Sequence, residues 1–126
     1  MKADFAGATD WFQRAWTDGP QRQPAQVDPA VRERVRAMVL EGLQPGKDDW
    51  PVLTPDPPAI GRLGEIRAPV LAILGGIDMP EIIDIVGRIE KEVPGARKAI
   101  FARAAHMVNM EEPERFNRVV LEFLGR

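Results

Sequence analysis

The residues best suited to chemistry in this chain are one aspartate and its single histidine. Asp78 lies in the turn Gly75-Gly76-Ile77-Asp78, directly after a short apolar run, and His106 follows a second short apolar segment after Ala104-Ala105. A carboxylate that accepts a hydrogen bond from one imidazole nitrogen fixes the tautomer and leaves the other nitrogen free to act as a base. The pair therefore predicts acid–base chemistry that needs a third, nucleophilic member.

That third member is not found among the usual residue types. The chain contains neither Ser nor Cys, and its aliphatic hydroxyls are Thr9, Thr17 and Thr54. None of the three threonines follows the strand–turn–helix pattern that exposes a nucleophile. We therefore expect no acyl-enzyme chemistry from these residues alone. One His without Cys leaves only scattered carboxylates as metal ligands, so we expect neither a metal site nor a cofactor.

Two predicted strands would position the pair. Residues 69–74 form a continuous apolar run that ends at two glycines, which is typical of a strand buried on both faces of a parallel sheet. Residues 98–101 form a second short strand, and the apolar spacing in 80–93 predicts the helix between them. Because the carboxyl ends of parallel strands share one edge, we expect Asp78 and His106 to lie within hydrogen-bond reach.

Helical patterns occupy much of the remaining sequence. Segments 6–16, 29–42, 59–66 and 113–124 carry apolar residues at helical spacing. In the first segment, Ala8, Trp11, Phe12, Ala15 and Trp16 form one stripe. We expect Trp11, Phe12 and Trp16 to form the core of this region rather than to contact a substrate. Thr17-Asp18-Gly19-Pro20 is expected to end that helix. The charges in Arg32–Arg36 are expected to face water.

Two segments of the second half resemble a known family. Residues 68–78 are similar to the seventh strand and acid loop of α/β-hydrolases, and residues 104–117 to that family's histidine loop and last helix. Val119–Leu124 fits the closing helix, and the order of acid before histidine agrees as well. Arg103 is a departure, since many relatives carry a small residue there.

The first half resembles the helical cap of esterase- and enol-lactonase-like members through residues 16–20 and 27–32. The chain is thus interpreted as a helical cap region (1–44), a proline-rich connector (45–58) and the C-terminal part of the hydrolase core (59–126). The fold class implied is α/β. A helical cap segment would precede a β-α-β-α unit that corresponds to the last two strands of an α/β-hydrolase sheet.

The resemblance implies a function as well as a fold. Asp78 would be the triad acid and His106 the base of an ester- or lactone-type hydrolase that acts on a small ester-like substrate. The match corresponds to about half of a full family member, and the first strands, the oxyanion loop and the G-x-S-x-G elbow have no counterpart here. We therefore expect this chain to be inactive by itself.

Two strands are too few for a stable sheet, and an unpaired apolar edge favours association with another chain. Three interpretations remain open: a piece of a larger hydrolase, one half of an enzyme split into two chains, or a non-catalytic, self-associating structural or binding module derived from a hydrolase. The expected partner is accordingly a second copy of the chain or a complementary N-terminal hydrolase half.

Composition excludes several other classes of function. Hydrophobic residues make up 44% and charged residues 29% of the chain, as in globular domains, and the net charge is −2. No basic block indicates nucleic-acid binding, and no apolar run is long enough for a membrane span. The first ten residues lack the apolar segment of a signal peptide, so we expect a cytoplasmic location.

Overall fold

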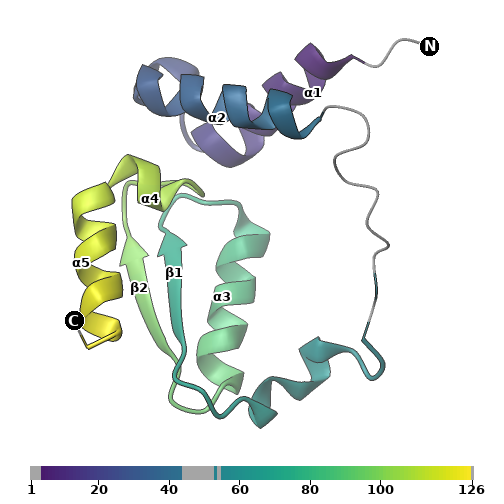
Figure 1. Ribbon diagram of the computed structural model, residues 1–126, viewed down its shortest axis with the longest axis vertical. Coiled ribbons are helices and arrows are strands. Elements are labelled where there is room, and N and C mark those ends of the chain that lie inside the picture. The colour runs from purple at the N-terminus through teal and green to yellow at the C-terminus, as the bar shows by residue number, and fades with distance from the viewer. Residues whose placement is uncertain (1–3, 44–52, 54, 126) are drawn as a thin grey trace.

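The computed structural model describes residues 4–43, 53 and 55–125 as a pair of parallel strands flanked by helices, with further helices above them (Figure 1). In chain order the elements are α1 (Phe5–Phe12), the π-helical η1 (Gln13–Asp18), the 3₁₀ turn η2 (Pro24–Gln26), α2 (Pro29–Gly42), the 3₁₀ helix η3 (Ala59–Glu65), β1 (Leu71–Gly75), α3 (Pro80–Glu92), β2 (Arg97–Phe101), α4 (Val108–Glu111) and α5 (Pro113–Phe123).

The second half forms the predicted β-α-β-α unit. Strands β1 and β2 are parallel, with Leu71 opposite Arg97 and Gly75 opposite Phe101. Helix α3 connects them, and α3 and α5 lie on opposite sides of the strand pair (Figure 1). Phe101, which is fully buried, packs with Ala104 and Val108 beneath α5. The α/β fold class is thereby confirmed.

One edge of β1 is open. The carbonyl oxygen of Val70 accepts from the Arg97 N–H at 2.9 Å, and the Gly76 N–H donates to Phe101 O at 2.8 Å. Successive residues of a strand direct their backbone groups to alternate sides, so the even-numbered residues face β2. The backbone groups of Leu71 and Ile73 therefore face the other edge, where no strand of the described chain pairs with them.

The helices of residues 4–43, called the cap below, lie over the carboxyl ends of the strands (Figure 1). Helix α2 begins as predicted, because the Asp28 carboxylate accepts from the Ala30 N–H at 2.8 Å and Pro29 occupies the first helical position. Val31 and Val35 are its buried residues. Within the described ranges, no helix is both long and apolar enough to cross a membrane.

The first cap helix differs from the prediction in where it ends. It continues from α1 into the π-helical η1 and reaches Asp18, so Thr17 and Asp18 belong to the helix instead of stopping it. Gly19, at φ 74°, is the residue that ends it, because glycine adopts positive φ without steric cost.

The buried side of that helix is also not the predicted one. Thr9, Gln13 and Thr17, spaced four residues apart, are buried, whereas Trp11 is 67% exposed. Two of these buried groups have partners, since Thr9 Oγ1 donates to Phe5 O and Gln13 Nε2 donates to a carbonyl of α2. The hydroxyl of Thr17 is buried without a hydrogen-bond partner among the described residues. The prediction that the aromatic stripe forms the core of the cap is therefore wrong for Trp11, and Phe12 and Trp16 are only half-buried.

Arg32 is a second correction in the cap. Its guanidinium forms an ion pair with Asp18, whose side chain is fully buried, so the predicted solvated face of α2 does not include it. The short helix α4 was not expected from sequence either. The proline-rich connector predicted at 45–58 lies largely outside the described residues, and the division into 1–44, 45–58 and 59–126 stays a prediction.

Candidate active site

Asp78 and His106 meet at the carboxyl edge of the two strands. Asp78 is 2% exposed, and its Oδ2 lies 2.7 Å from Nδ1 of His106. The other carboxylate oxygen, Oδ1, accepts from the Met79 N–H at 2.8 Å. Both oxygens are thus engaged, and the contact that the sequence predicts between the two side chains is present.

This geometry decides which imidazole nitrogen is available. Because a carboxylate oxygen is an acceptor, Nδ1 carries the proton of the neutral ring and Nε2 keeps its lone pair. The His106 side chain is 41% exposed, so a reacting group has access to it. A cavity of about 250 Å³ opens at the pair and is lined also by Ile73, Gly75, Ile82, Val108, Asn109 and Phe116.

Two glycines allow the acid loop (residues 76–79) to approach the histidine loop (residues 102–107) closely. A Cβ on Gly75 would lie 1.9 Å from Ala105 O, and a Cβ on Gly76 would lie 2.8 Å from the Cα of Ala102. The Gly76 and Ile77 N–H groups donate to Phe101 O and Ala104 O. The two loops are therefore joined by backbone contacts that a side chain at either glycine would obstruct.

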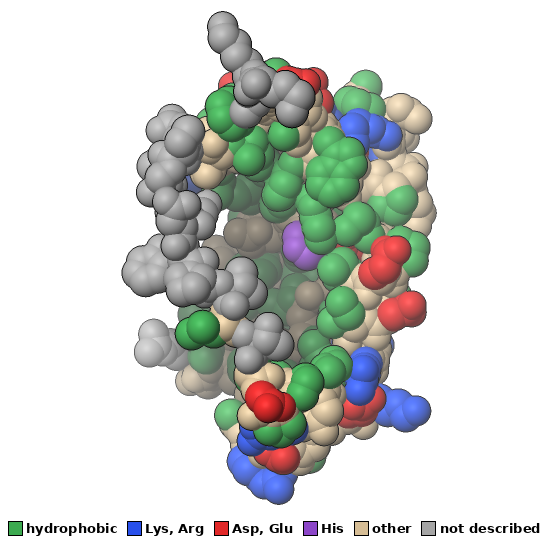
Figure 2. Space-filling view, turned by 90° about the vertical axis from the view of Figure 1, so that its right-hand side faces the viewer, with side chains coloured by type: hydrophobic (Ala, Val, Ile, Leu, Met, Phe, Trp, Pro, Cys, Tyr) green, Lys and Arg blue, Asp and Glu red, His purple; other side chains and the backbone are tan. Residues whose placement is uncertain are grey.

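Two aromatic residues of the cap, Trp16 and Phe12, lie beside the site, which the sequence did not predict. The indole of Trp16 lies edge-on to the imidazole of His106, with ring centroids 4.7 Å apart, and Phe12 lies 6.2 Å from Trp16. Figure 2 shows the histidine at the margin of a hollow surrounded by hydrophobic side chains. No signal in the sequence gives this placement, because apolar spacing shows which residues share a helix face but not which neighbour that face meets.

The described threonines do not offer a nucleophile. Thr9 and Thr17 are both fully buried in the cap, and Thr54 lies outside the described residues. Across the described ranges, no group of three or more His, Cys, Asp or Glu side chains is placed to hold a metal ion.

Known proteins share both sequence and fold with this chain, although no family model matches it. A 65-residue stretch is 45% identical to a 2-hydroxy-6-oxononadienedioate/2-hydroxy-6-oxononatrienedioate hydrolase from Burkholderia vietnamiensis, and it covers 52% of this chain and 23% of that protein. The whole chain superposes on 46% of a hydrolase from Pseudomonas aeruginosa, with a TM-score of 0.71 and 27% identity.

A bromoperoxidase from Bacillus anthracis shares the fold, with a TM-score of 0.71 and 20% identity over 98% of this chain and 45% of that one. The chain thus spans less than half the length of either solved structure. By sequence and by fold, the chain belongs to the α/β-hydrolase superfamily and corresponds to part of the length of the members that it matches.

Proposed function

We propose that this chain supplies the cap and the acid–base pair of an α/β-hydrolase site, with Asp78 as the triad acid and His106 as the general base. The observation that carries the proposal is the 2.7 Å contact between Asp78 Oδ2 and His106 Nδ1 at the carboxyl edge of two parallel strands. It leaves Nε2 without this contact on a side chain that is 41% exposed, so Nε2 is the nitrogen available to act as the base.

In such a site the base acts twice. His106 Nε2 takes the proton of an attacking hydroxyl and later returns it to the leaving group, while Asp78 stabilises the imidazolium that forms between the two steps. The buried position of Asp78 suits this role, because a carboxylate shielded from water interacts more strongly with the positive ring.

We expect the nucleophile of this site to come from residues outside this chain. The sequence has no Ser or Cys, and the two described threonines are buried. The open edge of β1 and the length of the superposed hydrolases both favour an additional N-terminal half that pairs with β1 and carries the nucleophile elbow. The isolated chain is then expected to be inactive.

Two substrate classes are worth assaying in a completed site. The apolar surroundings of His106 suit the acyl or ring portion of a small ester or lactone, and Trp16 is placed to contact it. The Burkholderia vietnamiensis relative is named for 2-hydroxy-6-oxononadienedioate and the corresponding trienedioate, which makes these compounds the second class.

The test compares the isolated chain with a completed form. We would join the chain to the part of the Pseudomonas aeruginosa hydrolase that lies outside the match, and measure hydrolysis of a p-nitrophenyl ester and of the dienedioate. The isolated chain should show no more turnover than its His106→Ala variant. The completed form should lose its activity with His106→Ala and fall about 10⁴-fold with Asp78→Asn, because the wrong tautomer is then favoured.

Arg88→Ala, on an exposed pair within α3, serves as the control and should leave turnover unchanged. Turnover by the isolated chain that His106→Ala abolishes would show that the chain holds its own nucleophile. A folded completed form whose activity does not depend on His106 would refute the assignment of the base.

A non-catalytic, self-associating module is the second candidate, and the open edge of β1 favours it. Leu71 and Ile73 present unpaired backbone groups there, and Ile83 and Ile85 of α3 are 37% and 50% exposed. A second copy could cover both features by pairing along β1. The mass of the chain in solution tests the self-association that this candidate requires.

A further inference from the structure

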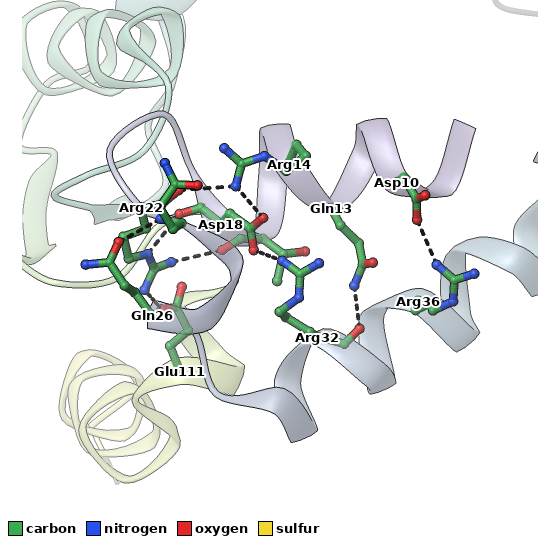
Figure 3. Close-up of polar contacts among 11 residues, drawn as sticks. Asp10, Gln13, Arg14, Asp18, Arg22, Gln26, Arg32, Arg36 and Glu111 are labelled. Carbon is green, nitrogen blue, oxygen red and sulfur yellow. Dashed lines mark hydrogen bonds and ion pairs between the residues drawn. The ribbon is translucent and has the colours of Figure 1, made fainter. Parts of the chain in front are cut away.

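Arg22 connects the cap to the histidine loop. Its Nε and Nη2 donate to the carbonyl oxygens of Asp18 and Thr17 at 2.8 and 2.9 Å, at the end of η1. Its Nη1 lies 2.5 Å from Oε2 of Glu111 in α4 and also donates to Arg103 O at 3.4 Å. One guanidinium therefore holds two parts of the chain that are 89 residues apart (Figure 3).

Glu111 links Arg22 to Ala105, the residue before the histidine. Its second oxygen, Oε1, accepts from the Ala105 N–H at 2.9 Å, and Ala105 itself is fully buried. The carboxylate thus bridges a cation of the cap and the backbone that carries His106. Because a backbone amide is fixed at this point, the direction in which the following side chain leaves the loop is restricted.

The cap end of this connection is itself held firmly. The buried Asp18 carboxylate forms two ion pairs, one through Oδ2 with Arg14 Nη1 at 2.8 Å and one through Oδ1 with Arg32 of α2. Both cap helices therefore meet at this residue (Figure 3). Gly19 follows at positive φ, and a Cβ there would lie 2.8 Å from Ile77 O and 3.0 Å from the Cβ of Ala105. The turn after η1 therefore contacts the acid loop and the histidine loop at once.

A purely stabilising role does not account well for this pair. The side chains of Arg22 and Glu111 are only 13% and 10% exposed, and desolvation offsets much of the attraction in a buried ion pair. Such pairs are better suited to fixing one arrangement among several. By contrast, the Arg88–Glu92 pair joins neighbouring turns of a single helix and is well exposed. Arg88 also donates to Ile60 O of η3, which belongs to neither loop of the site.

We propose that Arg22 and Glu111 are positioning residues for His106. Glu111 holds the Ala105 amide so that Nδ1 of His106 contacts Asp78. Arg22 makes this arrangement depend on how the cap packs over the strands. The importance of the pair for hydrolysis rests on the proposed function. Its effect on the imidazole does not, and can be measured in the chain as it is.

The experiment uses the ¹⁵N spectrum of the single histidine, whose two ring nitrogens report the tautomer and the Nδ1–H···Asp78 hydrogen bond. We expect Glu111→Ala and Arg22→Ala to lose the Nδ1–H tautomer under conditions in which both variants remain folded. Glu111→Gln keeps an oxygen for the Ala105 N–H but loses the ion pair with Arg22, so it should retain more of the Nδ1–H tautomer than Glu111→Ala. Glu92→Ala is the matched control and should leave the spectrum unchanged.

A loss of stability alone would not support the proposal. If Glu111→Ala lowers the unfolding midpoint but the folded protein keeps the wild-type imidazole signals, the pair is structural and the proposal is overturned. Asp78→Ala separates the two hypotheses. If it changes the signals while Glu111→Ala does not, only the positioning role fails. If Asp78→Ala leaves them unchanged, the Asp78–His106 contact fails, and the proposed function fails with it.

Discussion

At the scale of single residues, the site depends on the absence of a side chain as much as on its two polar groups. Asp78 reaches His106 only because the acid loop and the histidine loop touch, and Gly75 lies where they touch. The space that a Cβ would need there is already occupied by Ala105 O. The two glycines after the apolar run are thus part of the site.

Gly75→Ala should therefore destabilise the protein by about 1–3 kcal/mol, as overpacking does, and should separate Asp78 from His106. Chemical denaturation followed by tryptophan fluorescence measures the first effect, and the imidazole ¹⁵N spectrum the second. Gly87→Ala is the matched control, since no atom lies within 4 Å of its Cβ. It lies inside helix α3 and should raise the stability by about 1 kcal/mol. Wild-type stability in Gly75→Ala would contradict the packing described here.

At the scale of elements, the cap helices are arranged by polar contacts while their aromatic residues are left for the site. Thr9, Gln13 and Asp18 mediate the contact of the first cap helix with itself and with α2. Trp16 is then directed toward His106. An amphipathic helix usually buries its apolar stripe against its nearest neighbour, whereas here Trp16 of the stripe meets His106 at the carboxyl edge of the strands and Trp11 is exposed.

The start of α2 offers a measurement of how much the cap depends on local sequence. Asp28→Ala removes the side-chain acceptor for the Ala30 N–H and should cost about 1 kcal/mol of stability. The same substitution at the exposed Asp84 of α3 serves as the control, and thermal unfolding monitored by circular dichroism compares the two. Equal effects of the two substitutions would show that Asp28 as N-cap of α2 contributes nothing to the free energy of unfolding.

At the scale of the whole molecule, the open edge of β1 is the surface that both candidate functions would use. A second copy that pairs along this edge needs the N–H groups of Leu71 and Ile73, whereas the pairing with β2 uses the even-numbered residues. A complementary hydrolase half would occupy the same edge. Burial of a few hundred Å² of apolar surface there would contribute several kcal/mol, at about 25 cal/mol per Å².

If the chain self-associates through β1, sedimentation at high micromolar concentration should show a dimer or larger assembly. Leu71→Pro should then shift it to monomer, because it removes a donor from the open edge while leaving the β1–β2 hydrogen bonds in place. Ala72→Pro, one residue along, removes a donor that faces β2 and should instead reduce folding itself. A wild-type chain that is a compact monomer at that concentration would refute self-association.

The sequence by itself determined the β-α-β-α unit and the meeting of Asp78 with His106. Both follow from local patterns: apolar runs of strand length, a helix between them, and polar residues after each strand, since parallel strands end at one edge. It also indicated the start of α2, because a helix N-cap is a property of a few adjacent residues.

Only the tertiary structure decided how the cap is used. Apolar spacing shows which residues share a helix face but not which neighbour that face meets, so the positions of Trp11 and Trp16 were not predictable. The links from Arg32 to Asp18, from Arg22 to Glu111 and from Glu111 to the Ala105 amide join residues 14, 89 and 6 positions apart, respectively. No local pattern encodes such pairs, because charged residues on a helix are by default solvated.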